Sequence, residues 1–178
     1  MDPLAILHKY YRPEDPAYAI LVEHSRAVTD RALAIGQRMG ADLRFIEEAG
    51  MLHDLGVFKT HAPGIGCHGP EHYMRHGILG RELLEQEGYP RHGLVCERHV
   101  GTGLTAEEIE RQGLPLPLRD MRPVSLEEQI IAYADKFYSK GSGALEVEEV
   151  RRRLGRHGPQ NLVTFDAWRA RFEPEGIL

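Results

Sequence analysis

The chain has 178 residues, 42% of them hydrophobic, which is enough for one globular domain with a sizeable core. Its formal net charge of −5 at pH 7 gives no basic surface for binding a nucleic-acid polymer. No apolar run approaches the roughly 20 residues that span a bilayer, so no membrane partner is expected. The N-terminus lacks the basic start and apolar core of a secretion signal. Two cysteines, Cys67 and Cys96, are too few for a disulfide framework, and we expect reduced thiols in a cytoplasmic protein.

A long helix is the first strong prediction along the chain, after a short N-terminal helix. Asp15 reads as its N-cap, and the helix is expected to run to about Met39, where Gly40 ends it. His24 lies within this helix, one turn from apolar residues on the same face. Taken alone, His24 fits a buried histidine that is hydrogen-bonded to a carbonyl.

The dipeptide His53-Asp54 closes the next predicted helix, which Asp42 caps. His53 falls on or beside the apolar face, and Asp54 lies about 100° further round the helix. Both side chains can reach one site only where the helix ends, and Gly56 supplies that ending. A buried carboxylate is costly unless it is paired or bound to a metal. The alternative for Asp54 is a surface residue at a helix C-terminus, where the helix dipole disfavours it.

Residues 59–70 form a Gly- and Pro-rich loop, which we expect to overhang the His53-Asp54 site and to contact substrate. Lys59 at its start is a candidate for binding a phosphate or another anion, the alternative being a solvated lysine. His61 and His68 lie within the loop, and the sequence leaves open whether they touch the site.

A third helix is predicted from Pro70 to about Glu87. His72 and His76 are four residues apart on it and would share a face. With His68 they are rivals for one ligand position, and the spacing does not choose among the three.

Two further inward histidine and aspartate positions follow. A short helix over about residues 91–100 carries His99 near one face, and Thr105 caps the next helix. Ser125 caps a helix in which Glu128 would complete a capping box. Asp135 near the end of that helix lies where a buried carboxylate needs a partner.

The fold class is predicted to be all-α, because the sequence shows no convincing strand pair. We expect one domain over residues 1–178, with a core of about 16–140 and a C-terminal helical extension of about 144–173. Two amphipathic segments in that extension predict a helical pair that closes the domain.

The inward histidines and aspartates together indicate a metal site, since each would otherwise need its own hydrogen-bond partner in a small interior. His24, His53, Asp54 and Asp135 can complete one site and leave positions for water. His76 and His99 can hold a second ion, with Asp54 bridging the two.

This order of ligands resembles the HD superfamily of metal-dependent phosphohydrolases from about His24 to Asp135. The matching segments are His24-Ser-Arg-Ala-Val, Leu52-His-Asp-Leu-Gly56, His76-Gly-Ile-Leu-Gly80, Glu97-Arg-His-Val-Gly101 and Ala132-Tyr-Ala-Asp-Lys136. The third segment favours His76 over His72 and His68 as the ligand. The two later histidine segments are similar to those of branches that hold two metals, including bacterial symmetrical dinucleoside-tetraphosphate hydrolases.

The resemblance implies hydrolysis of a phosphoester or phosphoanhydride in a nucleotide or small phosphorylated metabolite. It implies one or two divalent ions (Fe, Mn, Ni, Zn or Mg), with Asp54 as a catalytic residue. Lys59 lies in the loop that the resemblance does not cover, and we predict it as a second catalytic residue because its charge could balance that of a phosphate. Lys136 and Arg98 are further candidates for balancing phosphate charge. A di-iron oxygenase with the same ligands is one alternative, and an idle nucleotide-binding module is another. A homodimer is left open.

Overall fold

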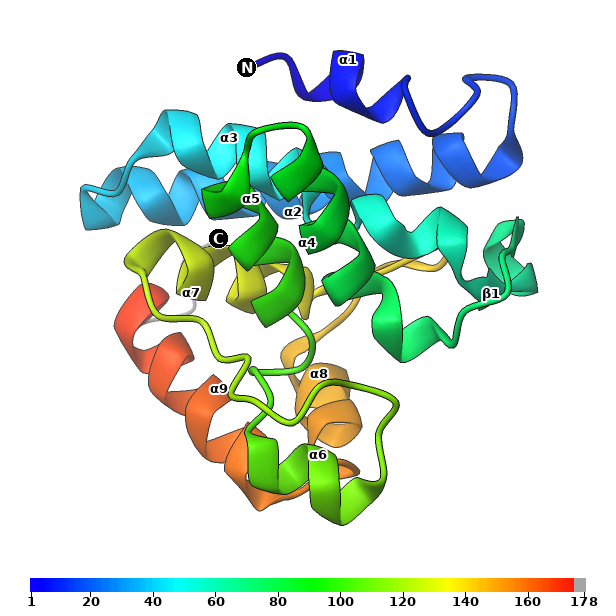
Figure 1. Cartoon of the computed structure of the whole chain (residues 1–178). Coiled ribbons are helices and arrows are strands. Elements are labelled where there is room, and N and C mark those ends of the chain that lie inside the picture. Colours follow the sequence, from blue (N-terminus) through cyan, green and yellow to red (C-terminus); the bar gives the residue numbers. More distant parts are fainter. Residues whose placement is uncertain (175–178) are drawn as a thin grey trace.

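The computed structural model describes residues 1–174 and is built from short and medium-length helices (Figure 1). The α-helices are α1 Pro3–Leu7, α2 Pro16–Met39, α3 Leu43–Leu52, α4 His76–Gln86, α5 Pro90–Arg98, α6 Ala106–Gln112, α7 Leu126–Asp135, α8 Val147–Gly155 and α9 Pro159–Phe172. Single 3-10 turns occur at η1 Leu55–Lys59, η2 Pro63–Ile65 and η3 Tyr73–Arg75. The all-α prediction is confirmed, and the last four residues of the predicted domain, 175–178, lie outside the described part.

The expectation of no strand pair is wrong in detail, because two small antiparallel hairpins are present. Strand β1 (His61–Ala62) pairs with β2 (Cys67–His68), and β3 (Tyr138–Ser139) pairs with β4 (Gly143–Ala144). Each strand is two residues long, which is too short to leave an alternating pattern in the sequence. The hairpins shape loops and add no sheet layer.

The predicted ends of α2 and the start of α3 agree with the structure, with one exception. Gly40 ends α2 in the left-handed conformation at φ 67°, and the Asp42 carboxylate accepts a 3.0 Å hydrogen bond from the Phe45 N–H. Asp15 stands at the N-cap position of α2, but its side chain makes no capping hydrogen bond. Pro16 at the first helical position has its φ fixed near the helical value and lacks an N–H, so it favours the helix start without leaving its own donor unpaired.

The helix predicted from Pro70 begins six residues later, at His76. The reason is the His72 ring, whose Nδ1 accepts a 3.1 Å hydrogen bond from the Met74 N–H and caps the 3-10 turn η3. His72 therefore does not share a helix face with His76, and the predicted i, i+4 pair is wrong.

The capping box predicted at Ser125 forms only in part. The Ser125 hydroxyl accepts a 3.1 Å hydrogen bond from the Glu128 N–H, but the Glu128 carboxylate accepts from the Val124 N–H at 2.8 Å instead of the Ser125 N–H. The same carboxylate pairs with Arg98, 3.0 Å distant. Thr105 and Glu108 at the start of α6 form the complete reciprocal box. Arg98 is thus engaged in an ion pair with Glu128.

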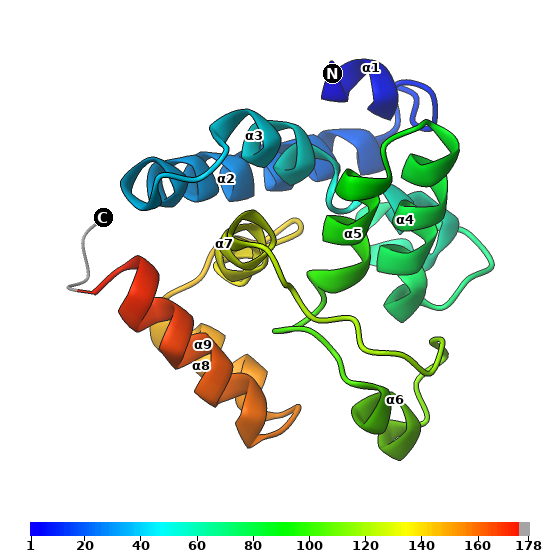
Figure 2. The same ribbon diagram turned by 60° about the vertical axis from the view of Figure 1, so that its left-hand side comes forward.

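The helices stack around α7 in the view of Figure 2. Helices α2 and α3 lie side by side on one side of α7, and α8 and α9 lie side by side on the other. The Tyr133 ring of α7 stacks on Phe165 of α9, with ring centroids 5.4 Å apart. The C-terminal helical pair therefore buries the face of α7 that α2 and α3 leave uncovered. The all-α prediction included such a pair.

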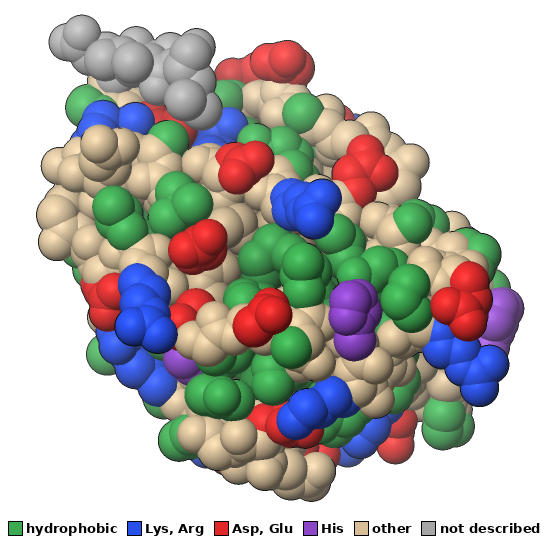
Figure 3. Space-filling view, turned by 90° about the horizontal axis from the view of Figure 1, so that it is seen from above, with side chains coloured by type: hydrophobic (Ala, Val, Ile, Leu, Met, Phe, Trp, Pro, Cys, Tyr) green, Lys and Arg blue, Asp and Glu red, His purple; other side chains and the backbone are tan. Residues whose placement is uncertain are grey.

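The surface fits the modest negative net charge of the chain. On the face seen in Figure 3, acidic and basic side chains are interspersed and do not gather into one large basic patch. Among the helices of residues 1–174, none is both long and apolar enough to cross a membrane.

Candidate metal centre

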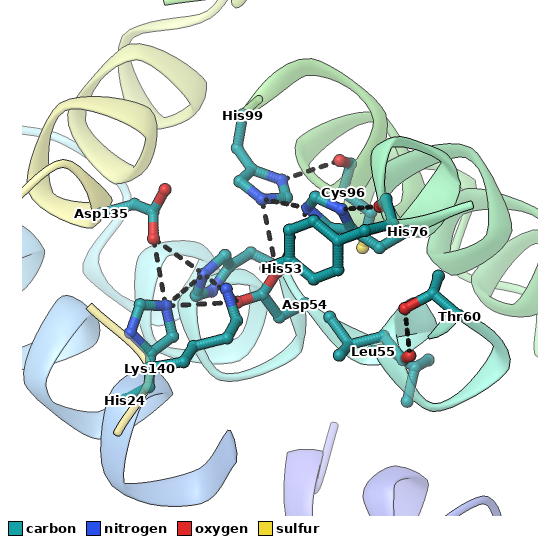
Figure 4. Close-up of polar contacts among 12 residues, drawn as sticks. His24, His53, Asp54, Leu55, Thr60, His76, Cys96, His99, Asp135 and Lys140 are labelled. Atoms are coloured by element: carbon teal, nitrogen blue, oxygen red, sulfur yellow. Dashed lines mark hydrogen bonds and ion pairs between the residues drawn. The ribbon is translucent and has the colours of Figure 1, made fainter. Parts of the chain in front are cut away.

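Six side chains from five helical segments converge at the centre of the molecule (Figure 4). They are His24 within α2, His53 and Asp54 directly after α3, His76 at the start of α4, His99 directly after α5 and Asp135 at the end of α7. The side chain of Asp54 is fully buried, and that of Asp135 is 11% exposed. All the residues predicted as metal ligands are thus brought together.

The first group of donors is His24, His53, Asp54 and Asp135. His24 Nε2 lies 3.2 Å from Asp54 Oδ2 and 3.1 Å from Asp135 Oδ1. His53 Nε2 lies 3.1 Å from the same Asp54 oxygen and 3.4 Å from the same Asp135 oxygen. Two imidazoles and two carboxylates therefore point at one small volume, a donor set that suits a divalent transition metal.

The second group is His76, His99 and Asp54. Both ring Nε2 atoms lie 3.4 Å from Asp54 Oδ1, the carboxylate oxygen that the first group does not use. Asp54 is therefore shared between the groups, one oxygen to each, in the way a bridging carboxylate joins two metal ions.

The ring orientations test whether the residues fit a cation. The Nδ1 atoms of three rings lie 2.7 or 2.8 Å from backbone carbonyls: His53 to Gly50, His76 to Tyr73 and His99 to Cys96. A neutral ring that donates at Nδ1 carries a lone pair at Nε2, and this is the usual orientation of metal-binding histidines.

Those Nε2 atoms face one another and face carboxylates. The pairs His24–His53 and His76–His99 have Nε2 atoms only 3.3 and 3.2 Å apart. Neither Asp54 oxygen accepts a well-directed hydrogen bond, although both are buried. His76 and His99 both donate at Nδ1, so their Nε2 lone pairs face each other beside Asp54 and would repel unless a cation lies between them. The first group brings two buried carboxylates and two rings to one point, so both groups fit a bound metal ion.

The end of α3 explains how neighbouring residues reach one site. His53 keeps helical geometry (φ −56°, ψ −27°), whereas Asp54 leaves it (φ −106°, ψ 13°) and turns its side chain inward. The prediction that Gly56 ends this helix is wrong, because α3 ends at Leu52 and Gly56 lies in the turn η1. Gly56 has another role, because a Cβ there would lie 2.3 Å from the His76 carbonyl oxygen. Glycine thus lets the turn after Asp54 lie against the helix that carries His76.

Glycines also bring the two later histidines together. A Cβ on Gly77 would lie 2.5 Å from the Cys96 carbonyl oxygen, and one on Gly80 would lie 3.1 Å from the Cys96 Cβ. The segment His76-Gly-Ile-Leu-Gly80 is therefore a close-packing surface that places α4 on α5. Without this approach His76 and His99 could not share an oxygen of Asp54.

The charges of the centre suit metal binding. Burial would raise the pKa of Asp54, but the Lys140 ammonium and His53 outweigh it and hold that pKa well below its usual range. Burial lowers the pKa of His53, but Asp54 and Asp135 raise it to about 10, whereas burial lowers the pKa of His76 to about 3. Ionised carboxylates and neutral imidazoles are the forms that bind metals, and a metal ion would displace the His53 proton.

Lys140 is a site residue that sequence reasoning missed. Its Nζ lies 2.6 Å from Asp54 Oδ2, on the turn between β3 and β4 (Figure 4). Its neighbour Lys136 has Nζ 2.8 Å from Asp135 Oδ2 and donates a 3.0 Å hydrogen bond to the His99 carbonyl. Nothing in the spacing points to Lys140, because it is placed at the centre by a short hairpin whose strands are two residues each.

A cavity of about 540 Å³ opens beside the first donor group. Its lining residues are His61, Ala62, Gly64, Ile65, Tyr73, Asp135, Lys136, Tyr138, Ser139, Lys140, Leu145, Val150, Arg153 and Leu154. The loop of residues 59–70 forms one wall, and α8 of the C-terminal pair forms another. Contact of the loop with substrate stays a prediction. Three cations and one carboxylate line this cavity in a protein of net charge −5, so it favours an anionic ligand.

Lys59 is half-buried and is not among the residues that line this cavity, so its catalytic role stays a prediction. The three histidines left open by the sequence have separate places. His61 lines the cavity, His68 is exposed on β2, and His72 caps η3. Within residues 1–174, none of the three joins either donor group.

The fold and site define an all-α protein with a buried centre of two His/Asp donor groups. The chain belongs to the HD domain family, which it matches over residues 21–139. That span contains all six convergent side chains.

Relatives at the sequence level include an uncharacterized protein of Methanocaldococcus jannaschii, 34% identical over 78% of this chain and 80% of that protein. Two proteins named tRNA (cytidine(56)-2′-O)-methyltransferase, from Thermoplasma volcanium and Picrophilus torridus, are 30% and 31% identical over 83% and 75% of this chain. In each, the matched part is 38% of the methyltransferase.

Two solved structures of the HD domain of the phosphodiesterase PgpH from L. monocytogenes share the fold. One has a TM-score of 0.52 and covers 84% of this chain and 89% of that domain. The other, in complex with cyclic-di-AMP, has a TM-score of 0.57 and covers 98% of this chain and 99% of that domain. Both are 15% identical to this chain, a likeness that concerns the fold.

Proposed function

We propose that the chain is a metal-dependent phosphohydrolase that cleaves a phosphoester or phosphoanhydride in a nucleotide or small phosphorylated metabolite. The observation that carries this proposal is the sharing of Asp54 between two donor groups whose ring nitrogens face one another. Such an arrangement fits two divalent ions close enough to act on one phosphoryl group.

The residues of the chain divide the work. His24, His53 and Asp135 would hold one ion, His76 and His99 the other, and Asp54 both. The ions supply a nucleophilic water near neutral pH and neutralise charge on the phosphoryl group.

Lysines beside the centre would neutralise the part of the phosphate charge that the metal ions do not. Lys136 and Lys140 line the anion-favouring cavity next to Asp135. Tyr73 and the loop of residues 59–70 wall the cavity and would keep the substrate against the centre.

The relatives guide the choice of substrates to test. PgpH has been solved with cyclic-di-AMP, so cyclic dinucleotides belong in the panel beside nucleotides and phosphomonoesters. The methyltransferases give no reason to expect methyl transfer here, since this chain corresponds to 38% of their length.

The test is elemental analysis of metal per chain, without chelator or histidine tag, followed by a phosphate-release and product screen in which each metal is added to the panel. We expect two ions per chain and metal-dependent hydrolysis. Oxygen-dependent turnover with two irons would replace the hydrolase by the oxygenase alternative. Nucleotide binding without turnover for any metal would leave the idle-module alternative.

A further inference from the structure

Two lysines of the centre make different contacts. Lys136 has two partners, the Asp135 carboxylate and the His99 carbonyl, which fix its ammonium from two sides. Lys140 Nζ lies 2.6 Å from Asp54 Oδ2 and 5.9 Å from the centre of the Tyr73 ring. Lys140 is therefore tied to the centre chiefly through the oxygen that the first donor group uses.

Asp54 Oδ2 is approached by two histidine rings as well as by Lys140. His24 Nε2 and His53 Nε2 lie 3.2 and 3.1 Å from Asp54 Oδ2, directed as they would be toward an ion bound there. A fully buried carboxylate needs a positive partner at all times. Without a metal ion the Lys140 ammonium is the nearest positive charge to this oxygen, at 2.6 Å, with the His53 ring beside it at 3.1 Å. With a metal ion bound, Lys140 would be a second cation at the same oxygen.

Lys140 has room to withdraw. It lies on the turn between β3 and β4, where Gly141 and Gly143 have φ values of 79° and 77°. The cavity of about 540 Å³ borders this turn, and a second cavity of about 320 Å³, which reaches His24, borders it as well. Tyr138 and Ser139 line both cavities, so open space borders the turn on two sides although Tyr138 also packs against the core.

We propose that Lys140 is an exchangeable counter-ion of Asp54. It neutralises Asp54 in the metal-free protein, competes with the metal ion of the first donor group, and moves into the larger cavity when that ion binds. The displaced ammonium then binds the anionic group of the substrate. This last step rests on the proposed function, whereas the competition with metal does not.

The test compares Lys140→Met with Lys9→Met, a control on an exposed lysine paired with Glu87. Mn²⁺ affinity is measured by titration against a chelator. Because removal of a competing cation strengthens binding of the other, we expect the tighter Mn²⁺ site to gain about tenfold in Lys140→Met, a usual size for coupling between ligands. The control should match the unsubstituted protein, and Lys140→Arg should stay near it.

Unchanged or weaker Mn²⁺ binding in Lys140→Met would overturn the proposal and make Lys140 a fixed support of Asp54. If the metal-free variant does not fold, the variant is purified with Mn²⁺ and the rate of Mn²⁺ loss to excess chelator is measured. Slower loss than in the unsubstituted protein is expected, and equal or faster loss overturns the proposal.

Inorganic phosphate probes the second step. We expect the Mn²⁺-loaded Lys140→Met protein to bind phosphate at least tenfold more weakly than the Lys9→Met control, because a charge-assisted contact is lost. Equal phosphate binding would remove the substrate role of Lys140. If tighter Mn²⁺ binding is found but no substrate is hydrolysed, the proposed function fails while the counter-ion role stands.

Discussion

The two donor groups are built in different ways, although they share Asp54. The first joins α2, α3 and α7 and has a second carboxylate, Asp135, with Lys136 and Lys140 at its edge. The second joins α4 and α5, contains no carboxylate of its own, and depends on close glycine contacts between those helices. Ion binding in the first group is therefore favoured by carboxylate charge, whereas in the second group it depends on the close packing of α4 on α5. We expect the first group to bind its ion more tightly.

The largest effect is expected from Asp54→Ala, which removes the residue common to both groups. Both ions should be lost and activity abolished, because four neutral imidazoles and the single remaining carboxylate, Asp135, do not offset the charge of two divalent cations. Metal per chain is measured by elemental analysis, and folding by circular dichroism. Asp30→Asn, at an exposed position of α2, is the matched control. Full activity in Asp54→Ala would contradict the assignment of Asp54 as a metal ligand.

A pair of variants separates the groups. His76→Gln should lose only the weaker ion, whereas His24→Gln should weaken the tighter one, since each ring contacts a different Asp54 oxygen. Activity should fall at least about 100-fold in both, because the chemistry needs both ions. Mn²⁺ titrations of the two variants give the assignment. Loss of the same ion from both would contradict separate groups.

Gly77→Ala tests whether packing sets the second group. Its Cβ would lie 2.5 Å from the Cys96 carbonyl oxygen, an overpacking that typically costs about 1–3 kcal/mol. We expect a lower urea midpoint and weaker binding of the second ion, with the first ion retained.

Gly155→Ala near the end of α8 is the control for that substitution. Its Cβ would make an ordinary 3.4 Å contact with Leu162, so the urea midpoint should stay the same or rise. A stable Gly77→Ala protein with both ions bound would show that the α4–α5 approach tolerates a methyl group.

The helices and inward donors could be predicted because helical periodicity places buried residues on one face and capping residues mark the ends. Periodicity places His24, His53 and Asp135 on inward helix faces, although His24 taken alone also fits a buried histidine bonded to a carbonyl. The resemblance of the segment His76-Gly-Ile-Leu-Gly80 to the HD superfamily favours His76 over His72 and His68. Lys140 could not be predicted in this way. Its position depends on a hairpin with strands of two residues each and on a contact with Asp54, which is far away in sequence. Neither feature leaves a local pattern in the sequence.

The start of α4 was misplaced for a related reason. The sequence around His72 is compatible with a helix, but the His72 ring caps a 3-10 turn and delays the helix to His76. Side-chain bonds of this kind decide helix ends among sequences of similar propensity, so they become visible only in the folded chain.

The smallest effect is expected from substitution of Lys59, because the sequence and the structure differ on how much Lys59 contributes to phosphate binding. The sequence predicts phosphate binding by Lys59, whereas Lys136 and Lys140 line the cavity beside Asp135 and Lys59 does not. We therefore expect Lys59→Met to raise KM by less than about fivefold, the effect of a distant or surface charge, and Lys136→Met to raise it more. Steady-state kinetics on the best substrate of the panel make the comparison. A KM increase in Lys59→Met that equals that of Lys136→Met would restore the sequence-based role, since it requires the loop of residues 59–70 to carry Lys59 to the phosphate when substrate binds.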